Sequence, residues 1–89
     1  MRTAILDGSR VSDRPSLHKE LHDVLRLPDY YGRNLDALFD CLTDLDEPVT
    51  LLVIEKETLD EALGSYAGKF YATLQDAAGD NDRFQFRVY

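Results

Sequence analysis

The chain of 89 residues has one cysteine, three prolines, no tryptophan and only ten basic residues. The single cysteine, Cys41, excludes an intrachain disulfide and suits a reducing compartment. Ten basic against seventeen acidic residues give a net charge of -7, whereas binding to a phosphate backbone requires clustered cations. We therefore expect no binding to nucleic acid, and the charge favours a basic protein as the partner.

Long hydrophobic runs are also missing. The N-terminal segment MRTAILDGSR has no apolar stretch long enough for a signal peptide or for a bilayer span. We therefore expect a cytoplasmic protein with no membrane contact.

Motifs of common enzyme classes are absent. No GxGxxG follows the first apolar run, and there is no Walker loop or GxSxG. His18 and His22 have a spacing that two metal ligands can share, but we expect them on the polar side of a helix, with no third ligand. The sequence thus predicts no enzyme, no metal site and no cofactor.

The composition is that of one globular domain spanning residues 1–89, with 44% hydrophobic and 30% charged residues. We predict strands at 3–6, 49–54 and 84–88. The second reads as a parallel strand covered on both faces, whereas the alternation in the third predicts an edge. Predicted helices begin after Ser12 or Asp13 and run to Leu27, cover 35–44 and 58–63, and run from 66 to a stop at Gly79.

Strands separated by helices predict an α/β fold in which about four helices pack the faces of a three-stranded parallel sheet.

The helix after Asn34 combines two patterns. Its core-facing stripe has the spacing i, i+3, i+4, i+7, with Asn34 as its cap. The stripe consists of Leu35, Leu38, Phe39 and Leu42. On the adjoining arc stand Asp36, Asp40 and Asp44, one turn apart, here called the acidic row. Around the helix axis, Cys41 is expected on the far side of Leu38 from the acidic row, as a small buried hydrophobic residue.

The acidic row breaks local rules. Like charges at i, i+4 destabilise a helix, and Asp44 stands at the end where the helix dipole disfavours an anion. Solvated helix faces are often acidic in so acidic a chain, so an ordinary exposed face is one interpretation. A cationic protein partner is the other, and the neighbouring Tyr30, Tyr31 and Gly32 favour it, because aromatics beside a charge cluster are typical of interfaces. One of the two tyrosines is expected to cover the core instead. A divalent cation is disfavoured, since carboxylates one turn apart make a poor cage.

The run YYGRNLDALFDCL resembles the signature helix of the barstar family of ribonuclease inhibitors. Shared with that family are Tyr31, Gly32, Asn34, Leu35, Asp36, Ala37, Leu38, Asp40, Cys41, Leu42 and Thr43. Weaker similarity extends along the whole chain. The resemblance implies an intracellular inhibitor, monomeric when free, that blocks the active site of a small, basic, secreted ribonuclease of the barnase type by imitating RNA phosphates.

The resemblance also implies roles for individual residues. Asp40 is similar to the carboxylate that enters the phosphate site, and Asp36 to its neighbour that pairs with further cations. Tyr30 or Tyr31 is similar to an aromatic that covers the catalytic histidine. Polar contacts are implied for Asn34 and Thr43, and a long-range one for Asp76. We expect the partner-binding residues to be Tyr30, Tyr31, Gly32, Asn34, Asp36, Phe39, Asp40, Thr43, Asp44 and Asp76.

The chain departs from the family at four positions in this region. Phe39 and Leu45 replace tryptophans, Asp44 replaces glycine, and Arg33 replaces an acid. These departures leave the identity of the partner open. An interaction or regulatory domain that binds another basic protein through the same face is the alternative.

Overall fold

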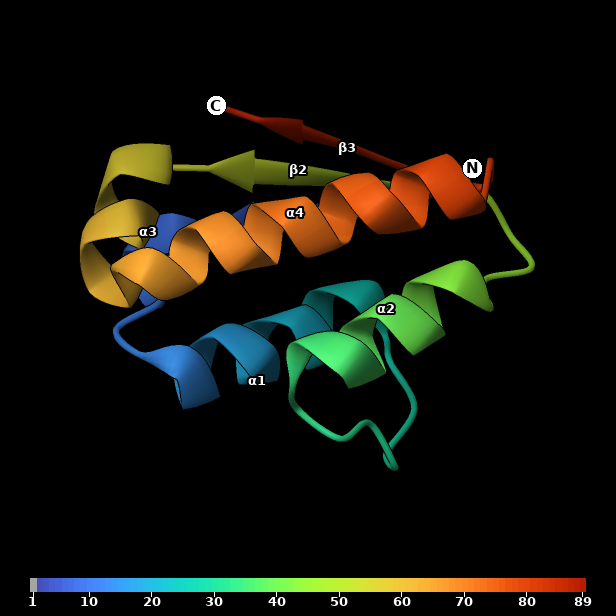
Figure 1. Ribbon diagram of the computed structural model, residues 1–89, viewed down its shortest axis with the longest axis horizontal. Coiled ribbons are helices and arrows are strands. Elements are labelled where there is room, and N and C mark those ends of the chain that lie inside the picture. The colour runs from blue at the N-terminus through green and yellow to red at the C-terminus, as the bar shows by residue number, and fades with distance from the viewer. Residues whose placement is uncertain (1) are drawn as a thin grey trace.

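The strand Val49–Ile54 (β2) forms the centre of the sheet in the computed structural model, which describes residues 2–89. The strand Arg2–Asp7 (β1) pairs with it in parallel on one side, and Phe84–Val88 (β3) on the other. Four α-helices and one 3-10 turn connect the strands (Figure 1). They are the 3-10 turn Gly8–Arg10 (η1) and the helices Arg14–Leu25 (α1), Leu35–Thr43 (α2), Lys56–Leu63 (α3) and Ser65–Asp80 (α4). The predicted α/β fold with a three-stranded parallel sheet is confirmed, as is the edge position of the last strand.

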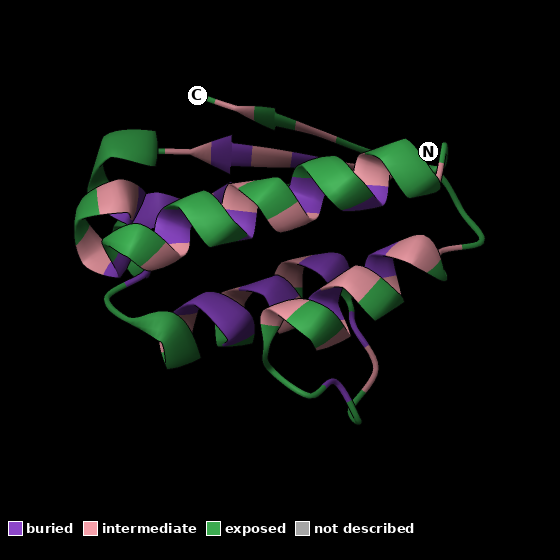
Figure 2. Cartoon of the chain, viewed as in Figure 1, coloured by how far each residue is buried: buried purple, intermediate pink, exposed green. Residues whose placement is uncertain are grey.

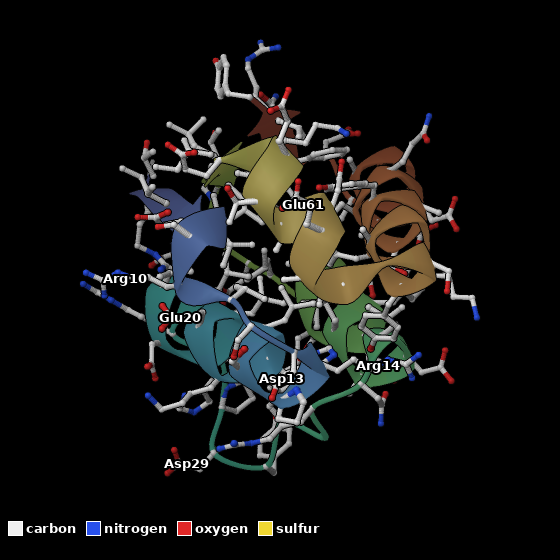
Figure 3. All side chains as sticks on the ribbon, turned by 90° about the vertical axis from the view of Figure 1, so that its left-hand side faces the viewer. Arg10, Asp13, Arg14, Glu20, Asp29 and Glu61 are labelled. Atoms are coloured by element: carbon white, nitrogen blue, oxygen red, sulfur yellow. The ribbon has the colours of Figure 1, made fainter. Side chains whose placement is uncertain are left out.

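The sheet is covered on one face only. Val49, Leu51 and Val53 are buried toward the helices, whereas the alternate side chains of β2 are half-buried and Ile5 of β1 is 52% exposed. The prediction that helices cover both faces is therefore wrong. The reason is the strand order. The connections from β1 to β2 and from β2 to β3 step in the same direction across the sheet, and right-handed crossovers of this kind place all their helices on one face. In Figure 3, which looks along the strands, the sheet lies at the upper left and the helices lie to its right and below it.

The core lies between this covered face and three roughly parallel helices, α1, α2 and α4 (Figures 1 and 2). Each helix contributes leucine or phenylalanine side chains that are almost completely buried. These include Leu17, Leu21 and Leu25 of α1, Leu38 and Leu42 of α2, and Phe70 and Leu74 of α4. Within residues 2–89, no helix is long and apolar enough to cross a bilayer.

Both ends of α1 are fixed by local contacts. Asp13 and Ser16 form a reciprocal capping box, with Pro15 in the first turn, as predicted for the start. The helix ends at Leu25, two residues earlier than expected, because Arg26 adopts the left-handed conformation with φ 55°. The guanidinium of Arg2 donates to the carbonyl of Leu25 at 2.9 Å, which satisfies an acceptor left free at the helix end.

The last helix, α4, ends one residue beyond its predicted stop. It passes through Gly79, so the expectation that this glycine ends it is wrong. The end comes at Asn81, whose side-chain amide donates to the carbonyls of Leu42 at 2.9 Å and Leu45 at 3.3 Å. A long-range contact that local sequence does not reveal thus ends α4 and ties it to the end of α2.

Gly8 is required by the close approach of η1 to the start of α3. A methyl group there would lie 2.5 Å from the carbonyl oxygen of Glu55 and 2.8 Å from Cβ of Leu59. We predict that Gly8→Ala lowers the free energy of unfolding by about 1–3 kcal/mol, the usual effect of overpacking. Gly68, in the middle of α4 with open space around it, is the matched control. Gly68→Ala should raise stability by about 0.5–1 kcal/mol. Urea unfolding of both variants checks this, and a neutral Gly8→Ala would contradict it.

Candidate protein-binding face

The rotation of α2 about its axis is fixed by its cap and by its buried side. The side-chain oxygen of Asn34 accepts from the Ala37 amide at 2.7 Å, which makes it the predicted cap. Leu38 and Leu42 are fully buried, and α2 packs mainly against α4. The hydroxyl of Thr43 donates back to the Phe39 carbonyl at 2.9 Å. The side of α2 opposite Leu38 and Leu42 therefore faces outward.

The acidic row occupies that outward side. Asp36, Asp40 and Asp44 are all exposed. Among residues 2–89, the side-chain ion pairs join His22 to Asp23 and Asp29, and Lys56 to Asp60. None of the three carboxylates of the acidic row has an internal cationic partner in this part of the chain. They are free to pair with an external one.

A shallow hollow of about 340 Å³ lies over the C-terminal half of the row. Its lining brings together four of the predicted contact residues and one other. These are Tyr30, Asp40, Cys41, Thr43 and Asp44. Tyr30 is 85% exposed, so an aromatic ring stands free beside two unpaired carboxylates. A hydrogen-bonding cation, such as a guanidinium, fits this combination of groups.

Cys41 lies closer to the acidic row than predicted. It is half-buried instead of fully buried, and it lines the hollow with Asp40 and Asp44. The helix wheel already contained this signal, because a residue three positions before Asp44 lies one turn from it on the same side. Burial raises the pKa of the Cys41 thiol, and the charges of Asp40 and Asp44 raise it further. The thiol is therefore held in its protonated form and is an uncharged part of the lining of the hollow.

Tyr31 points the opposite way from Tyr30. It is only 5% exposed, so its expected role as a contact residue does not fit its position; it is the tyrosine of the pair that covers the core. Its hydroxyl forms a short hydrogen bond with Nδ1 of His18. Tyr31 thereby holds residues 26–34, here called the tyrosine loop, onto α1. Figure 3 shows Asp29 at the outer tip of this loop.

His18 is buried, with 1% of its surface exposed, so the expectation that it lies on the polar side of α1 is wrong. Its second ring nitrogen, Nε2, is 2.8 Å from the hydroxyl of Tyr66 on α4. The guanidinium of Arg14 lies over the Tyr66 ring, 4.3 Å from its centroid. One imidazole therefore joins α1, α4 and the tyrosine loop. Burial lowers its pKa below the ordinary 6.5, and the charge of Arg33 lowers it further.

The other predicted contact residues have mixed positions. Asn34 is exposed but its side chain is used in capping, and Gly32 is exposed beside it, where a Cβ would come within 3.2 Å of the Ala37 side chain. Phe39 is half-buried and packs against the core. Asp76 is exposed on α4 and does not line the hollow. The structure thus concentrates the candidate face on the acidic row, Tyr30 and the hollow between them.

These features define a class of protein: a small α/β domain that presents an acidic helix and an aromatic loop, with no group of three or more His, Cys, Asp or Glu in residues 2–89 placed to hold a metal. The family model "Barstar (barnase inhibitor)" matches residues 1–89, and the chain belongs to the barstar family. It is similar to a protein of Bacillus subtilis (strain 168) with the name "Putative ribonuclease inhibitor YrdF". The two are 47% identical over 90 residues, which cover 99% of each chain.

The buried state of His18 predicts a specific pH dependence of stability. Because its pKa is lower in the folded protein, the unfolded chain takes up a proton first as the pH falls. The stabilisation is complete above about pH 6.5 and is lost as the pH falls from there toward the folded-state pKa. We predict that the free energy of unfolding declines in this window, and that His18→Gln flattens the decline. His22→Gln, four residues away on α1, should retain it. Urea unfolding at a series of pH values checks this; equal slopes in the parent and His18→Gln would contradict it.

Proposed function

We propose that this protein is an intracellular ribonuclease inhibitor that blocks the active site of a small, basic, secreted ribonuclease of the barnase type. Membership of the barstar family and the name of the Bacillus relative support the inhibitor role. The observation that carries the mechanism is the acidic row, three exposed carboxylates without internal partners beside a free tyrosine. In this mechanism the carboxylates take the places of RNA phosphates.

The geometry supports this mechanism in physical terms. A ribonuclease active site holds cations that bind the phosphates of its substrate, and a carboxylate offers the same charge and hydrogen-bond acceptors. The carboxylates of the acidic row break no internal ion pair when they bind, so only their hydration is lost. The row stands on a helix whose cap and core contacts already fix its direction. Little conformational entropy is therefore lost on association.

Asp40 is the centre of the proposed contact. It stands in the middle of the acidic row and also lines the hollow next to Tyr30. A ribonuclease that covers this hollow reaches Asp40 and Asp44 but leaves Asp36 at its edge. Of the two, Asp40 is desolvated more completely, because it lies in the middle of the row, whereas Asp44 stands at the helix end. The ring of Tyr30 closes the hollow from the loop side and excludes water from the charge pair. Interface energy concentrates in such desolvated central groups.

Alanine variants of the acidic row test this ranking. We predict that Asp40→Ala weakens inhibition by about 2–5 kcal/mol, because it leaves buried cations of the ribonuclease unpaired; barnase–barstar is itself a reference case for this range. Asp44→Ala at the rim should cost about 1 kcal/mol or less. Both variants should fold, with equal or slightly higher stability, since each relieves repulsion at i, i+4.

The measurement combines inhibition of a barnase-type ribonuclease with thermal unfolding of each variant. Glu61→Ala is the matched control, because it removes one exposed carboxylate from α3, far from the tyrosine loop (Figure 3). It corrects for the change in net charge. Asp40→Ala that inhibits as well as Glu61→Ala would refute Asp40 as the phosphate mimic. A parent protein that captures another basic protein instead of a ribonuclease would favour the alternative of a regulatory domain.

The focused charge also predicts fast, salt-dependent association. Between Asp29 and Glu47 there are six acidic residues and one basic residue, so this segment alone carries -5 of the net charge of -7. Such a field raises the association rate with a cationic partner most strongly at low ionic strength. We predict that the on-rate falls steeply with added salt while the dissociation rate changes little. Stopped-flow binding at several salt concentrations checks this, and a constant on-rate would exclude the acidic row as the docking face.

A further inference from the structure

Arg33 is the one base in the otherwise acidic segment from Asp29 to Glu47. It directly precedes Asn34, the cap of α2, and its side chain is exposed. Its backbone is left-handed, with φ 55°, a conformation that L residues other than glycine, asparagine and aspartate rarely adopt. The chain therefore places an arginine where glycine would fit the backbone better.

The charge is also unfavourable at this place. Arg33 stands at the N-terminal end of α2, where the helix dipole favours an anion. Within residues 2–89 its guanidinium makes no hydrogen bond or ion pair. Two of the other six arginines make side-chain contacts: Arg2 binds the carbonyls at the end of α1, and Arg14 covers the Tyr66 ring. Neither penalty at Arg33 is offset by a side-chain hydrogen bond, ion pair or cation–π contact within residues 2–89.

Arg26 provides an internal comparison. It has the same backbone conformation, with φ 55°, and is also exposed. It stands, however, at the C-terminal end of α1, where the dipole favours a cation. The helix dipole therefore favours the positive charge of Arg26 at the end of α1 and disfavours that of Arg33 before α2. A residue that breaks local rules without internal compensation points to a role outside the chain, as the acidic row does.

We infer that Arg33 determines which ribonuclease this protein inhibits, by pairing with a carboxylate at the rim of the partner's basic cleft. The inference rests on the proposed function. Arg33 stands three residues before Asp36, at the N-terminal end of α2 where the acidic row begins. The complementary surface is a cluster of cations with one acid at its edge. Ribonucleases that carry a base at that edge are rejected by like-charge repulsion.

Arg33 is placed to act on the same partner as Tyr30. It belongs to the tyrosine loop, three residues after Tyr30, and the side chains of both residues are exposed. A rim ion pair contributes little attraction, whereas an unpaired or opposed charge in a desolvated contact costs much more. The side chain therefore serves discrimination between partners more than affinity for one.

The test uses the parent protein, Arg33→Gln, Arg33→Glu and Lys19→Glu against a barnase-type ribonuclease secreted by the producing organism. Lys19 is an exposed base on α1, so Lys19→Glu makes the same change of net charge away from the face. We expect Arg33→Gln to weaken binding about 2- to 5-fold and Arg33→Glu about 10-fold or more beyond Lys19→Glu. Thermal unfolding should show Arg33→Glu at least as stable as the parent, because the helix dipole favours the new charge.

The outcomes separate the two proposals. A parent protein that does not bind the ribonuclease overturns both. If the parent binds and Arg33→Glu matches Lys19→Glu, or binds more tightly, the role of Arg33 is overturned and the inhibitor function stands. Replacing acids at the rim of the ribonuclease cleft with lysine, one at a time, should yield one variant that Arg33→Glu binds at least 10-fold better than the parent protein does. The absence of any such variant also overturns the inference.

Discussion

The packing of α2 against α4 is the interaction on which the candidate face depends. A helix of nine residues is too short to be stable alone in water, so its existence rests on tertiary contacts. Leu38 and Leu42 are fully buried, and each such leucine contributes about 1.5–3 kcal/mol. The two like-charge pairs of the acidic row cost only a few tenths of a kcal/mol each. Packing therefore outweighs repulsion, and the same burial that stabilises the helix turns its carboxylates outward.

The tyrosine loop is likewise held in place by buried contacts, but these are hydrogen bonds instead of apolar packing. Tyr31 points inward to His18 and leaves Tyr30, its neighbour in sequence, 85% exposed. Tyr66 holds the other side of the imidazole, so the loop is linked through one side chain to both α1 and α4. A buried imidazole without partners is costly, and the two hydroxyls offset that cost. An exposed aromatic on a fastened loop loses less entropy on binding than one on a loose loop.

The sequence predicted those features that depend on residues close together in the chain. The cap at Asn34, the core-facing stripe of α2 and the outward acidic row follow from helical spacing, and the structure has all three, with Leu35 and Phe39 of the stripe only partly buried. It did not predict features that depend on distant partners. The burial of His18 requires Tyr66, 48 residues away, and the end of α4 requires the carbonyls at the end of α2. The open face of the sheet follows from strand order, which is a property of the whole chain.

Unfavourable charges at α2 stand at opposite ends of the helix. Arg33 precedes its N-terminus, where a cation is disfavoured, and Asp44 caps its C-terminus, where an anion is disfavoured. Exchanging the two charges would complement the dipole, so stability of the free protein does not explain the arrangement. A partner with the opposite charge pattern would relieve both penalties at once. The free energy gained by relieving them would then add to the difference in affinity between correct and incorrect partners. The cost therefore falls at two positions where charge can discriminate between partners.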